Sequence, residues 1–332
     1  MEKYSLGIDI GGTFIKYALV DENYNIKEKW KIKTTKFETK DELYDYICSN
    51  MRYIESVDVI GISAPGLIDE YSNVKSFAAP NVVSMYGTNI NDEISKRVNK
   101  KVASINDAKS AGLCEFEIGN AKGSKSSAFL ILGTGTGGCL CDKDGVVYGT
   151  DSFAAEFHNI PFMNFETKKI DKMGDYSSMT GLINIYNKKV DEDKQVAYGH
   201  EVCEKFLDED EIAKEVVKEW IHNIVIQLIA ITVTYNPEVI CIGGGISEED
   251  WFINELKKHY KEVCIEYLEA DFITTKIERC KYNNDANILG AIINANLKNT
   301  ANRRTAKKNR PRQLRQGRLL ISFFKKVNEK GN

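Results

Sequence analysis

The sequence of 332 residues lacks the segments that would place it in a membrane or a secretory pathway. No run approaches the roughly 18 consecutive apolar residues that a bilayer-spanning helix needs. The first residues carry one lysine and then turn at once into a strand pattern, without the apolar core and cleavage site of a signal peptide. We therefore expect a cytoplasmic protein without a membrane partner.

The eight cysteines form no CxxC pair and no dense disulfide pattern, which is typical of a reducing compartment. Cys139 and Cys141 lie two residues apart in a predicted strand, so they point to one face and could share a metal ion. No second pair of ligands follows them in the sequence. We interpret both as small core residues.

Arginine is scarce outside the C-terminal tail, which we define as residues 299–332. The tail holds six of the nine arginines, 11 of the 45 basic residues and 1 of the 48 acidic residues. The preceding residues 1–298 then carry 34 basic and 47 acidic residues, a formal charge of −13. An acidic body argues against a nucleic-acid-binding surface, and any polyanion binding would depend on the tail alone.

The length predicts about two domains, and helix and strand patterns alternate as in α/β proteins. We expect an N-terminal domain over residues 1–105 and a C-terminal domain over 106–285, with a closing helix at 286–298 that packs back on the first. Both halves show a strand ending in glycines, a strand hairpin, then helix and strand. Two such domains facing each other across a cleft would hold a nucleotide and a second substrate together.

The individual elements follow from apolar periodicity and from glycine or proline at their ends. Predicted strands cover residues 4–10, 14–20, 30–33, 57–63, 101–105, 128–132 and 239–242. Predicted helices cover residues 41–54, 90–98, 108–116, 208–235, 247–263 and 286–297, the first with Thr39 as its cap.

Three glycine-bearing turns follow apolar strands, at residues 9–13, 133–138 and 243–245. Because glycine has no Cβ, backbone N–H groups can approach phosphate oxygens closely, and threonine hydroxyls add donors. None of the turns matches the Walker pattern or the GxGxxG pattern at the opening of a βαβ unit. Each turn alone is more readily explained as a structural hairpin, but three of them behind strands, in both halves, favour a nucleotide site.

Four charged side chains stand at these strand ends or in apolar surroundings, and each has a structural alternative. Asp9 suits a Mg²⁺ ion held through water, or a turn cap. Lys16 lies in an apolar strand and needs an anionic partner, for which a phosphate would serve. Asp107, after Asn106, suits a general base or a helix N-cap. Glu156 follows an apolar stretch and suits hydrogen bonding to a polyol, or a place on the surface.

Together these segments resemble the ROK family (repressors, open reading frames and sugar kinases) of the actin-like ATPase fold, over residues 4–298. The resemblance rests on motifs in family order: LGIDIGGTFIKYAL, GISAPGLID, APN at 79–81, INDAKSAGLCE, LGTGTGG, PEVICIGGGIS and NNDANILGAI. It implies an α/β protein with two actin-like (ribonuclease H-like) α/β domains flanking a cleft. It also implies a homodimer.

The resemblance implies ATP-dependent phosphorylation of a hexose-type sugar, expected at O6. Asp107 would be the base that takes the proton from the sugar hydroxyl as it attacks the γ-phosphate. The implied sugar-binding residues are Gly66, Asn81, Asn106, Asp107, Glu156, His158 and Asn159. The implied nucleotide-binding residues are Gly11, Gly12, Thr13, Lys16, Gly133, Thr134, Gly135, Thr136, Gly244 and Gly245, with Asp9 helping to place Mg²⁺.

Two departures from the family pattern matter. The family often has ExGH, whose histidine contacts the sugar and binds zinc, whereas here Glu156 is followed by Phe157, His158 and Asn159. By register Asn159 takes the place of the histidine, and a one-residue slip would give that place to His158. The family's zinc cluster CxCGxxGCxE is also missing, so we expect no structural zinc.

The stretch MGDYSSMTGLI resembles instead the zinc-free branch of the family, which includes β-glucoside kinases. We therefore hypothesise that the C1 side of the sugar tolerates a substituent. The sequence leaves the sugar open among glucose, N-acetylmannosamine, N-acetylglucosamine, fructose, allose and β-glucosides.

Three other functions compete with a sugar kinase. Regulators of the family carry a helix-turn-helix domain before the first phosphate motif, and the early position of Asp9 leaves no room for one. A sugar-binding protein without catalysis is disfavoured because Asp107 and the glycine turns are present. A non-sugar kinase of the same fold, such as an acetate kinase type, is disfavoured because the sugar loops match.

The tail is not part of the resemblance. We favour a disordered or foreign extension, such as a frameshifted end, because the tail is rich in arginine and the body is not. A docking helix and an arm for nucleic acid or a membrane surface are the alternatives.

Overall fold

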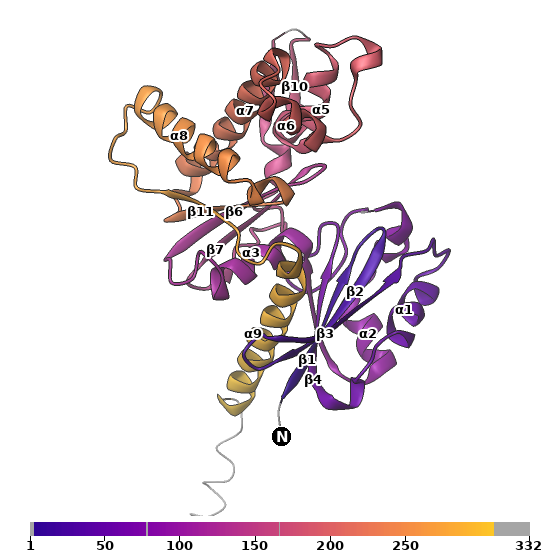
Figure 1. Cartoon of the computed structure of the whole chain (residues 1–332). Helices are drawn as coiled ribbons and strands as arrows, with labels where there is room; N and C mark the ends of the chain where they lie inside the picture. The colour runs from indigo at the N-terminus through magenta and orange to yellow at the C-terminus, as the bar shows by residue number, and fades with distance from the viewer. Residues whose placement is uncertain (1–2, 78, 166, 309–332) are drawn as a thin grey trace, which may run out of the picture. The chain divides into compact units, whose positions relative to one another are not determined.

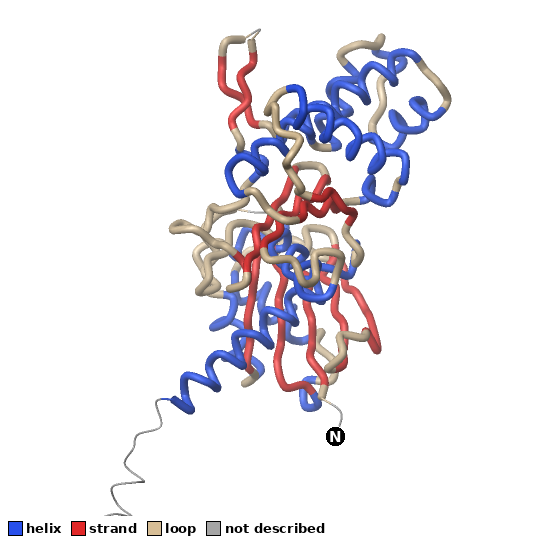
Figure 2. Tube along the Cα trace, turned by 90° about the vertical axis from the view of Figure 1, so that its left-hand side faces the viewer, coloured by secondary structure: helices blue, strands red, loops and turns tan. Residues whose placement is uncertain are grey.

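The computed structural model describes residues 3–77, 79–165 and 167–308, with side chains up to residue 300. The described chain up to Ala295 forms one compact unit. It contains two five-stranded mixed sheets and one two-stranded hairpin, with helices around them (Figures 1 and 2). The expected mixed α/β architecture with two sheets is thus confirmed.

The first sheet has the strand order β3-β2-β1-β4-β5. Its strands are β1 (Tyr4–Ile10), β2 (Phe14–Asp21), β3 (Ile26–Lys33), β4 (Val57–Ala64) and β5 (Lys101–Asn106). β1 pairs antiparallel with β2 and parallel with β4, and β4 pairs parallel with β5. Parallel pairing brings the ends of β1, β4 and β5 to the same edge of the sheet, where Asp9 is the last residue but one of β1 and Asp107 directly follows β5.

The helices and turns associated with this sheet are α1 (Lys40–Ser49), η1 (Ile54–Ser56), η2 (Pro80–Met85) and α2 (Ile90–Val98). α1 begins with a capping box, in which Thr39 accepts a hydrogen bond from the backbone of Glu42 and the Glu42 side chain bonds back. The predicted cap at Thr39 is therefore confirmed.

The second sheet repeats the plan of the first with the order β8-β7-β6-β11-β12. Its strands are β6 (Ser126–Leu132), β7 (Thr136–Asp142), β8 (Gly145–Val146), β11 (Val239–Gly243) and β12 (Lys276–Arg279). β6 pairs antiparallel with β7 and parallel with β11, as β1 does with β2 and β4. The two sheets thus share strand order and strand direction, and each has a glycine turn after its central strand.

A segment between β8 and β11 adds structure that the sequence patterns did not predict. It comprises η3 (Phe157–Asn159), β9 (Pro161–Asn164), β10 (Lys169–Lys172), α4 (Gly174–Ser177), α5 (Met179–Asn187), η4 (Glu192–Lys194) and α6 (Gly199–Leu207). The helix that follows, α7 (Glu211–Tyr235), agrees with the helix predicted over residues 208–235. The remaining elements are α3 (Asp107–Ile118), η5 (Gly245–Glu248), α8 (Asp250–Glu266), η6 (Asn283–Asp285) and α9 (Ala286–Lys308).

α7 is long and apolar enough to cross a membrane by length and composition, which the search for apolar runs did not indicate. However, 67% of its most apolar window is buried inside the structure. Trp220 is completely buried and donates its indole N–H to the carbonyls of Ser177 and Ser178. These features are typical of a core helix.

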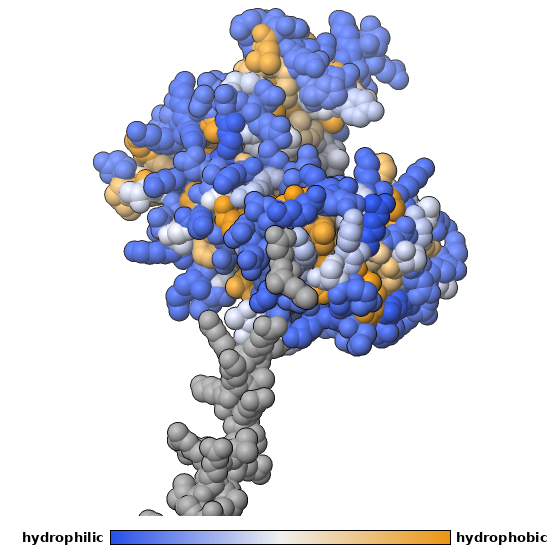
Figure 3. All heavy atoms as spheres, turned by 60° about the horizontal axis from the view of Figure 1, so that its bottom comes forward, coloured by the Kyte–Doolittle hydropathy of each residue, from blue (hydrophilic) through white to orange (hydrophobic). Residues whose placement is uncertain are grey.

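On the face shown in Figure 3, hydrophobic side chains are scattered among hydrophilic ones.

Cys139 and Cys141 are both buried, with their sulfurs 3.6 Å apart, in a cluster with Phe129 and Cys241. Burial raises the pKa of the Cys141 thiol, with the neighbouring Cys139 adding to the effect. The interpretation of this pair as core residues is confirmed.

The first turns of α9 pack with the first sheet and α3, since Ile288 and Ile292 belong to the same core cluster as Ala18, Ile105 and Leu113. The predicted end of this helix at residue 297 is wrong, because the helix continues to Lys308. Apolar periodicity stops at 297, but the following residues are still compatible with helix. The rest of the tail, 309–332, lies outside the described residues, and so do the interpretations placed on it.

Candidate active site

Asp9 closes β1 and is almost completely buried, with 5% of its surface exposed. Its Oδ1 accepts hydrogen bonds from the Ser63 hydroxyl (2.9 Å) on β4 and from Asn287 Nδ2 (3.3 Å) on α9. Its Oδ2 lies 3.3 Å from the ammonium of Lys16, which is opposite Asp9 in the β1–β2 register. Three elements therefore converge on one carboxylate, and Lys16 has the anionic partner that its strand position demands.

The junction between β5 and α3 separates the roles of Asn106 and Asp107. Asn106 is the N-cap of α3, because its Oδ1 accepts from the backbone N–H of Lys109 at 3.0 Å. Its Nδ2 donates to the carbonyl of Gly66 (2.9 Å) and to Asp107 Oδ1 (2.8 Å). The capping role considered for Asp107 is thus filled by Asn106.

Asp107 is half-buried, and its Oδ1 also accepts from the backbone N–H of Ala108 at 2.7 Å. The pKa of this carboxyl is raised to about 6, chiefly by burial and also by the negative charges of Asp9 and Glu156, against the opposing hydrogen bonds from Ala108 and Asn106. A carboxylate with a pKa near neutrality suits a general base, because it is ionised at neutral pH yet retains affinity for a proton.

A cavity of about 490 Å³ opens between Asp107 and the glycine turn that joins β6 to β7. Its lining includes Asp107, Gly133, Thr134, Gly135, Thr136, His158 and Asn287. Among the described residues, Thr136 Oγ1 and His158 Nδ1 are buried without a hydrogen-bond partner. Unpaired buried polar atoms in a glycine turn are suited to an incoming polar ligand such as a phosphate.

A second cavity of about 210 Å³ shares Ala111, Ile131 and Asn287 with the first. Lys16 and the third glycine turn, residues 243–245, also line it. Gly244 has φ of +96°, and a Cβ there would lie 2.0 Å from the carbonyl oxygen of Leu132. A side chain at this position would clash with the backbone of β6, so glycine is required for the close approach of the turn to that strand.

The remaining residues assigned to the first phosphate turn lie beside this region. Gly11 and Gly12 are half-buried, and Thr13 is exposed. The Thr34 hydroxyl donates to the carbonyl of Gly11 at 2.7 Å, which fixes the turn between β1 and β2. Asn81, expected on the sugar side, donates from Nδ2 to the carbonyl of Gly12 at 2.9 Å. The structure therefore joins the loop at 79–81, which was expected on the sugar side, directly to the turn between β1 and β2.

Glu156 immediately precedes η3 and accepts a hydrogen bond from the ammonium of Lys109, Nζ to Oε1 3.1 Å. His158 lines the cavity with Asp107, and its Nε2 lies 3.5 Å from Asp175 Oδ1. A Cβ at Gly174 would lie 1.9 Å from His158 Nδ1, so the imidazole depends on glycine there. Asn159 follows in the same turn, and its backbone N–H donates to the carbonyl of Glu156.

Three residues of this region were not singled out from the sequence: Ser63, Lys109 and Asn287. Ser63 and Asn287 bond Asp9, and Lys109 bonds Glu156. Asn287 lies within the motif NNDANILGAI, which was a usable signal. Ser63 and Lys109 also lie within quoted motifs, GISAPGLID and INDAKSAGLCE, but the motifs do not name their partners, which are 54 and 47 residues away in the chain.

Within the described ranges, no group of three or more His, Cys, Asp or Glu side chains could hold a metal ion. A single buried carboxylate such as Asp9 fits an ion that keeps mostly water and phosphate ligands. Mg²⁺ behaves in this way because it gives up its water reluctantly. Asp9 is thus a fitting group for a Mg²⁺ ion that accompanies a nucleotide.

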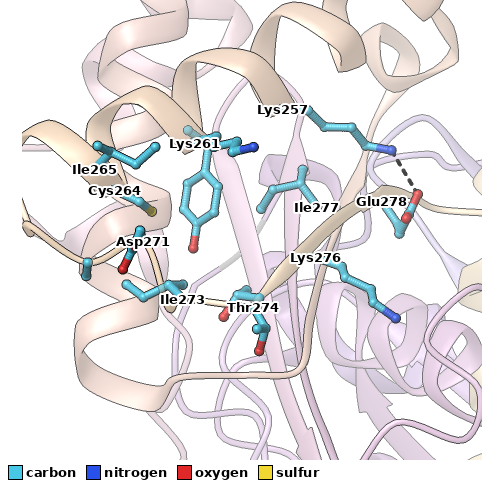
Figure 4. Close-up of a pocket in the computed structure, with 13 residues that line it drawn as sticks. Lys257, Lys261, Cys264, Ile265, Asp271, Ile273, Thr274, Lys276, Ile277 and Glu278 are labelled. Carbon is cyan, nitrogen blue, oxygen red and sulfur yellow. Dashed lines mark hydrogen bonds and ion pairs between the residues drawn. The ribbon is translucent and has the colours of Figure 1, made fainter.

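Another cavity, of about 580 Å³, lies between α8 and β12 (Figure 4). Lys257, Lys261 and Lys276 line it beside Asp271 and Glu278, and Lys257 is paired with Glu278 at 3.0 Å. Its charges are mixed and partly paired, so the lining selects no ligand class. The convergence of carboxylates and glycine turns makes the Asp107 cavity the candidate active site.

The family model named ROK family matches residues 5–297. The chain belongs to the ROK family. A glucokinase of Thermotoga maritima is 26% identical over 305 residues, covering 86% of this chain and 95% of its own. A β-glucoside kinase of Listeria monocytogenes is 27% identical over 293 residues, covering 86% of this chain and 94% of its own.

Among solved structures, a ROK family protein from Streptococcus pneumoniae in complex with sucrose superimposes with a TM-score of 0.78. It is 23% identical, and the match covers 90% of this chain and 99% of the other. This likeness confirms the expected actin-like arrangement of two α/β domains. The two kinases above support phosphorylation of a sugar as the general activity of the chain.

Proposed function

We propose that this ROK protein is an ATP-dependent sugar kinase that transfers the γ-phosphoryl group to O6 of a hexose-type sugar, with Asp107 as the general base. The observation that carries the proposal is the position of Asp107. Its carboxyl has a pKa raised to about 6 and lines one cavity with the glycine turn at residues 133–137.

In the proposed reaction, the sugar hydroxyl gives its proton to the Asp107 carboxylate and its oxygen attacks the γ-phosphorus. The bond between the γ-phosphorus and its bridging oxygen breaks, and ADP leaves with the bond's electron pair. Positioning and charge neutralisation supply most of the rate enhancement in phosphoryl transfer. A positioned carboxylate base adds about 10²–10⁴-fold.

The groups around Asp107 divide between the two substrates in this proposal. Lys16 and the three glycine turns bind the phosphates and the adenosine, and Asp9 helps to place Mg²⁺, which neutralises phosphate charge. Gly66, Asn81, Asn106 and Glu156 contact the sugar hydroxyls. Either His158 or Asn159 completes the sugar site, and the position of His158 in the Asp107 cavity favours His158.

We propose a β-glucoside as one of the sugars to be tested first. The chain lacks the family's cysteine cluster and resembles the zinc-free branch, and one of its relatives is named as a β-glucoside kinase. A substituent at C1 would leave O6 free to react. We propose that the protein binds no structural zinc.

The proposal is tested by coupling ADP release to NADH oxidation with each of the six sugar classes named above, cellobiose serving as a β-glucoside. We expect turnover with at least one sugar, loss of turnover with excess EDTA, and recovery with Mg²⁺. The position of the phosphate is read from phosphorus–proton NMR of the product. Absence of turnover with every sugar, at normal folding, would contradict the kinase; a phosphate away from O6 would contradict the regiochemistry.

A sugar-sensing role without catalysis predicts sugar binding without turnover, and calorimetry on the same sugars distinguishes it from the kinase. We also propose that the protein acts in the cytoplasm as a homodimer. Light scattering coupled to size-exclusion chromatography tests the dimer, and a monomer mass would contradict it.

A further inference from the structure

Lys109 is a charged side chain that is completely buried, with 0% of its surface exposed. It lies on α3, two residues after Asp107. Burying an ammonium group is unfavourable unless the charge is paired and hydrogen-bonded. Its ammonium meets Glu156 Oε1 at 3.1 Å, across 47 residues of sequence.

Glu156 differs from Lys109 because 30% of its side chain is exposed. One carboxylate oxygen is held by Lys109, and part of the carboxylate stays accessible. Glu156 is also close enough to Asp107 for its negative charge to act on that group. The pair therefore joins the interior of α3 to the turn that carries His158.

The charged and titratable groups around Asp107 come from several elements. Asp9 lies at the end of β1 and is paired with Lys16 on β2. Glu156 and His158 come from the turn at η3. Lys109 is the cation on the same helix as Asp107, and it is in contact with Glu156.

We infer that Lys109 is a positioning residue for sugar recognition, which fixes the Glu156 carboxylate toward the substrate and offsets its charge beside Asp107. The inference rests on the proposed function, because it deepens the role of the same site. A fixed carboxylate binds a hydroxyl without first losing conformational freedom. The ammonium of Lys109 also offsets the negative charge that Glu156 places near Asp107.

A purely structural role accounts poorly for this lysine. Apolar side chains of similar volume are often as stable or more stable in place of a buried ion pair. Lys257 and Glu278 form the matched comparison, since they are 3.0 Å apart but each is 41% exposed, and they line the cavity between α8 and β12 (Figure 4), whose lining does not include Asp107. An exposed pair of that kind contributes little to stability.

The test is a double-mutant cycle of Lys109→Met and Glu156→Gln, measured with whichever sugar the wild-type protein phosphorylates. We expect Lys109→Met to raise the KM for sugar at least about tenfold and the KM for ATP less than about threefold. In the Glu156→Gln background, Lys109→Met should add less than about threefold, because its effect passes through Glu156. Lys257→Met is the control and should leave both KM values unchanged.

The acid limb of the kcat/KM profile gives an independent measurement. Removing the cation while Glu156 stays ionised should move this limb to higher pH, and the double variant should return it toward the wild type. A merely structural lysine would lower the unfolding temperature without either change. If Lys109→Met does not fold, the KM values and the acid limb of Glu156→Gln are compared with those of the double variant, in which neither side chain is charged.

The inference is overturned if Lys109→Met leaves the KM for sugar unchanged, or if the double variant loses a further tenfold relative to Glu156→Gln alone. Either result leaves the proposed function intact, because wild-type turnover is the reference for the cycle. Absence of wild-type turnover would instead contradict the proposed function, and calorimetric sugar affinities would then decide the role of Lys109.

Discussion

Asp9 and Asp107 lie at the same edge of the first sheet, one at the end of β1 and the other directly after β5, but their surroundings differ. Asp9 has partners on both oxygens, from Ser63, Asn287 and Lys16. Asp107 has both of its hydrogen bonds on Oδ1, from Ala108 and Asn106. No cation contacts Asp107 among the residues that the structure describes.

One edge of the sheet thus places two carboxylates in different surroundings, and these surroundings suit different chemical roles. Partners hold Asp9 in one orientation, which suits a fixed electrostatic role beside a metal ion. Burial and like charges raise the pKa of Asp107 to about 6, which suits proton transfer. The predictions below separate these two roles.

The largest expected effect comes from Asp107→Asn. Loss of the base should lower kcat about 10²–10⁴-fold and leave sugar affinity within a few fold, because the amide oxygen can still accept from Ala108. Steady-state kinetics and calorimetry with sugar measure the two quantities. A variant with wild-type kcat would remove Asp107 from the role of base.

Asp9→Asn should have a smaller effect of a different kind. The neutral amide weakens the hold on hydrated Mg²⁺, so kcat/KM for Mg-ATP should fall about 10–100-fold. The concentration of Mg²⁺ needed for half-maximal rate should rise, whereas sugar affinity should not change. A Mg²⁺ titration of both proteins measures this, and coincident titration curves would contradict the metal role.

The pH dependence follows from the pKa of Asp107, which is raised from 3.8 to about 6. The base must be ionised, so kcat/KM for the sugar should be level above neutrality and fall about tenfold per pH unit well below 6. Rates between pH 4.5 and 8.5 at saturating Mg-ATP measure this limb. A level profile down to pH 5 would contradict the assignment.

The same raised pKa has a consequence for stability. The folded state binds the Asp107 proton more tightly than the unfolded chain, and this stabilisation is complete below about pH 3.8 and lost as the pH rises through about 6. Asp107→Asn should therefore be more stable than the wild type at pH 8, on the order of 1–2 kcal/mol for a half-buried group. The gain should vanish at pH 4 in urea unfolding, and equal stability at pH 8 would contradict it.

The smallest effect on turnover is expected from Ser63→Ala. The variant removes a buried hydrogen bond to the charged Asp9, which should lower the free energy of unfolding by about 1.5–3 kcal/mol. Lys16 and Asn287 still hold the carboxylate, so kcat should change less than about threefold. Thermal unfolding and kinetics measure the two, and a tenfold loss of kcat would show that Ser63 does more than support Asp9.

Much of the fold could be predicted from local patterns. The strands of the first sheet, the cap of α1 and the glycine turns agree with the structure, because each depends on residues within a few positions. The segment from residue 147 to 207 was not predicted. Its elements are short, and several of them, such as α4 with 4 residues, are too brief to show a period.

The candidate site also has parts that local sequence patterns could predict and parts that they could not. Asp9, Asp107 and the glycine turns were recognisable because each stands at a strand end in a family motif. The proposal favours His158 over Asn159 because His158 lines the cavity, and the space for its imidazole depends on Gly174, 16 residues further on in the sequence. The end of α9 was missed because apolar periodicity stops at residue 297, whereas the backbone stays helical to Lys308 without it.

By itself, the sequence determined the repeated α/β plan, the family and the residues that follow the strands, because periodicity, glycine and motif order are local or linear properties. Tertiary structure alone decided that Asn106 and not Asp107 caps α3, that Asp9 is shared by three elements, and that a buried Lys109 meets Glu156. These features arise from contacts between distant segments, and their energies depend on burial and charge in three dimensions.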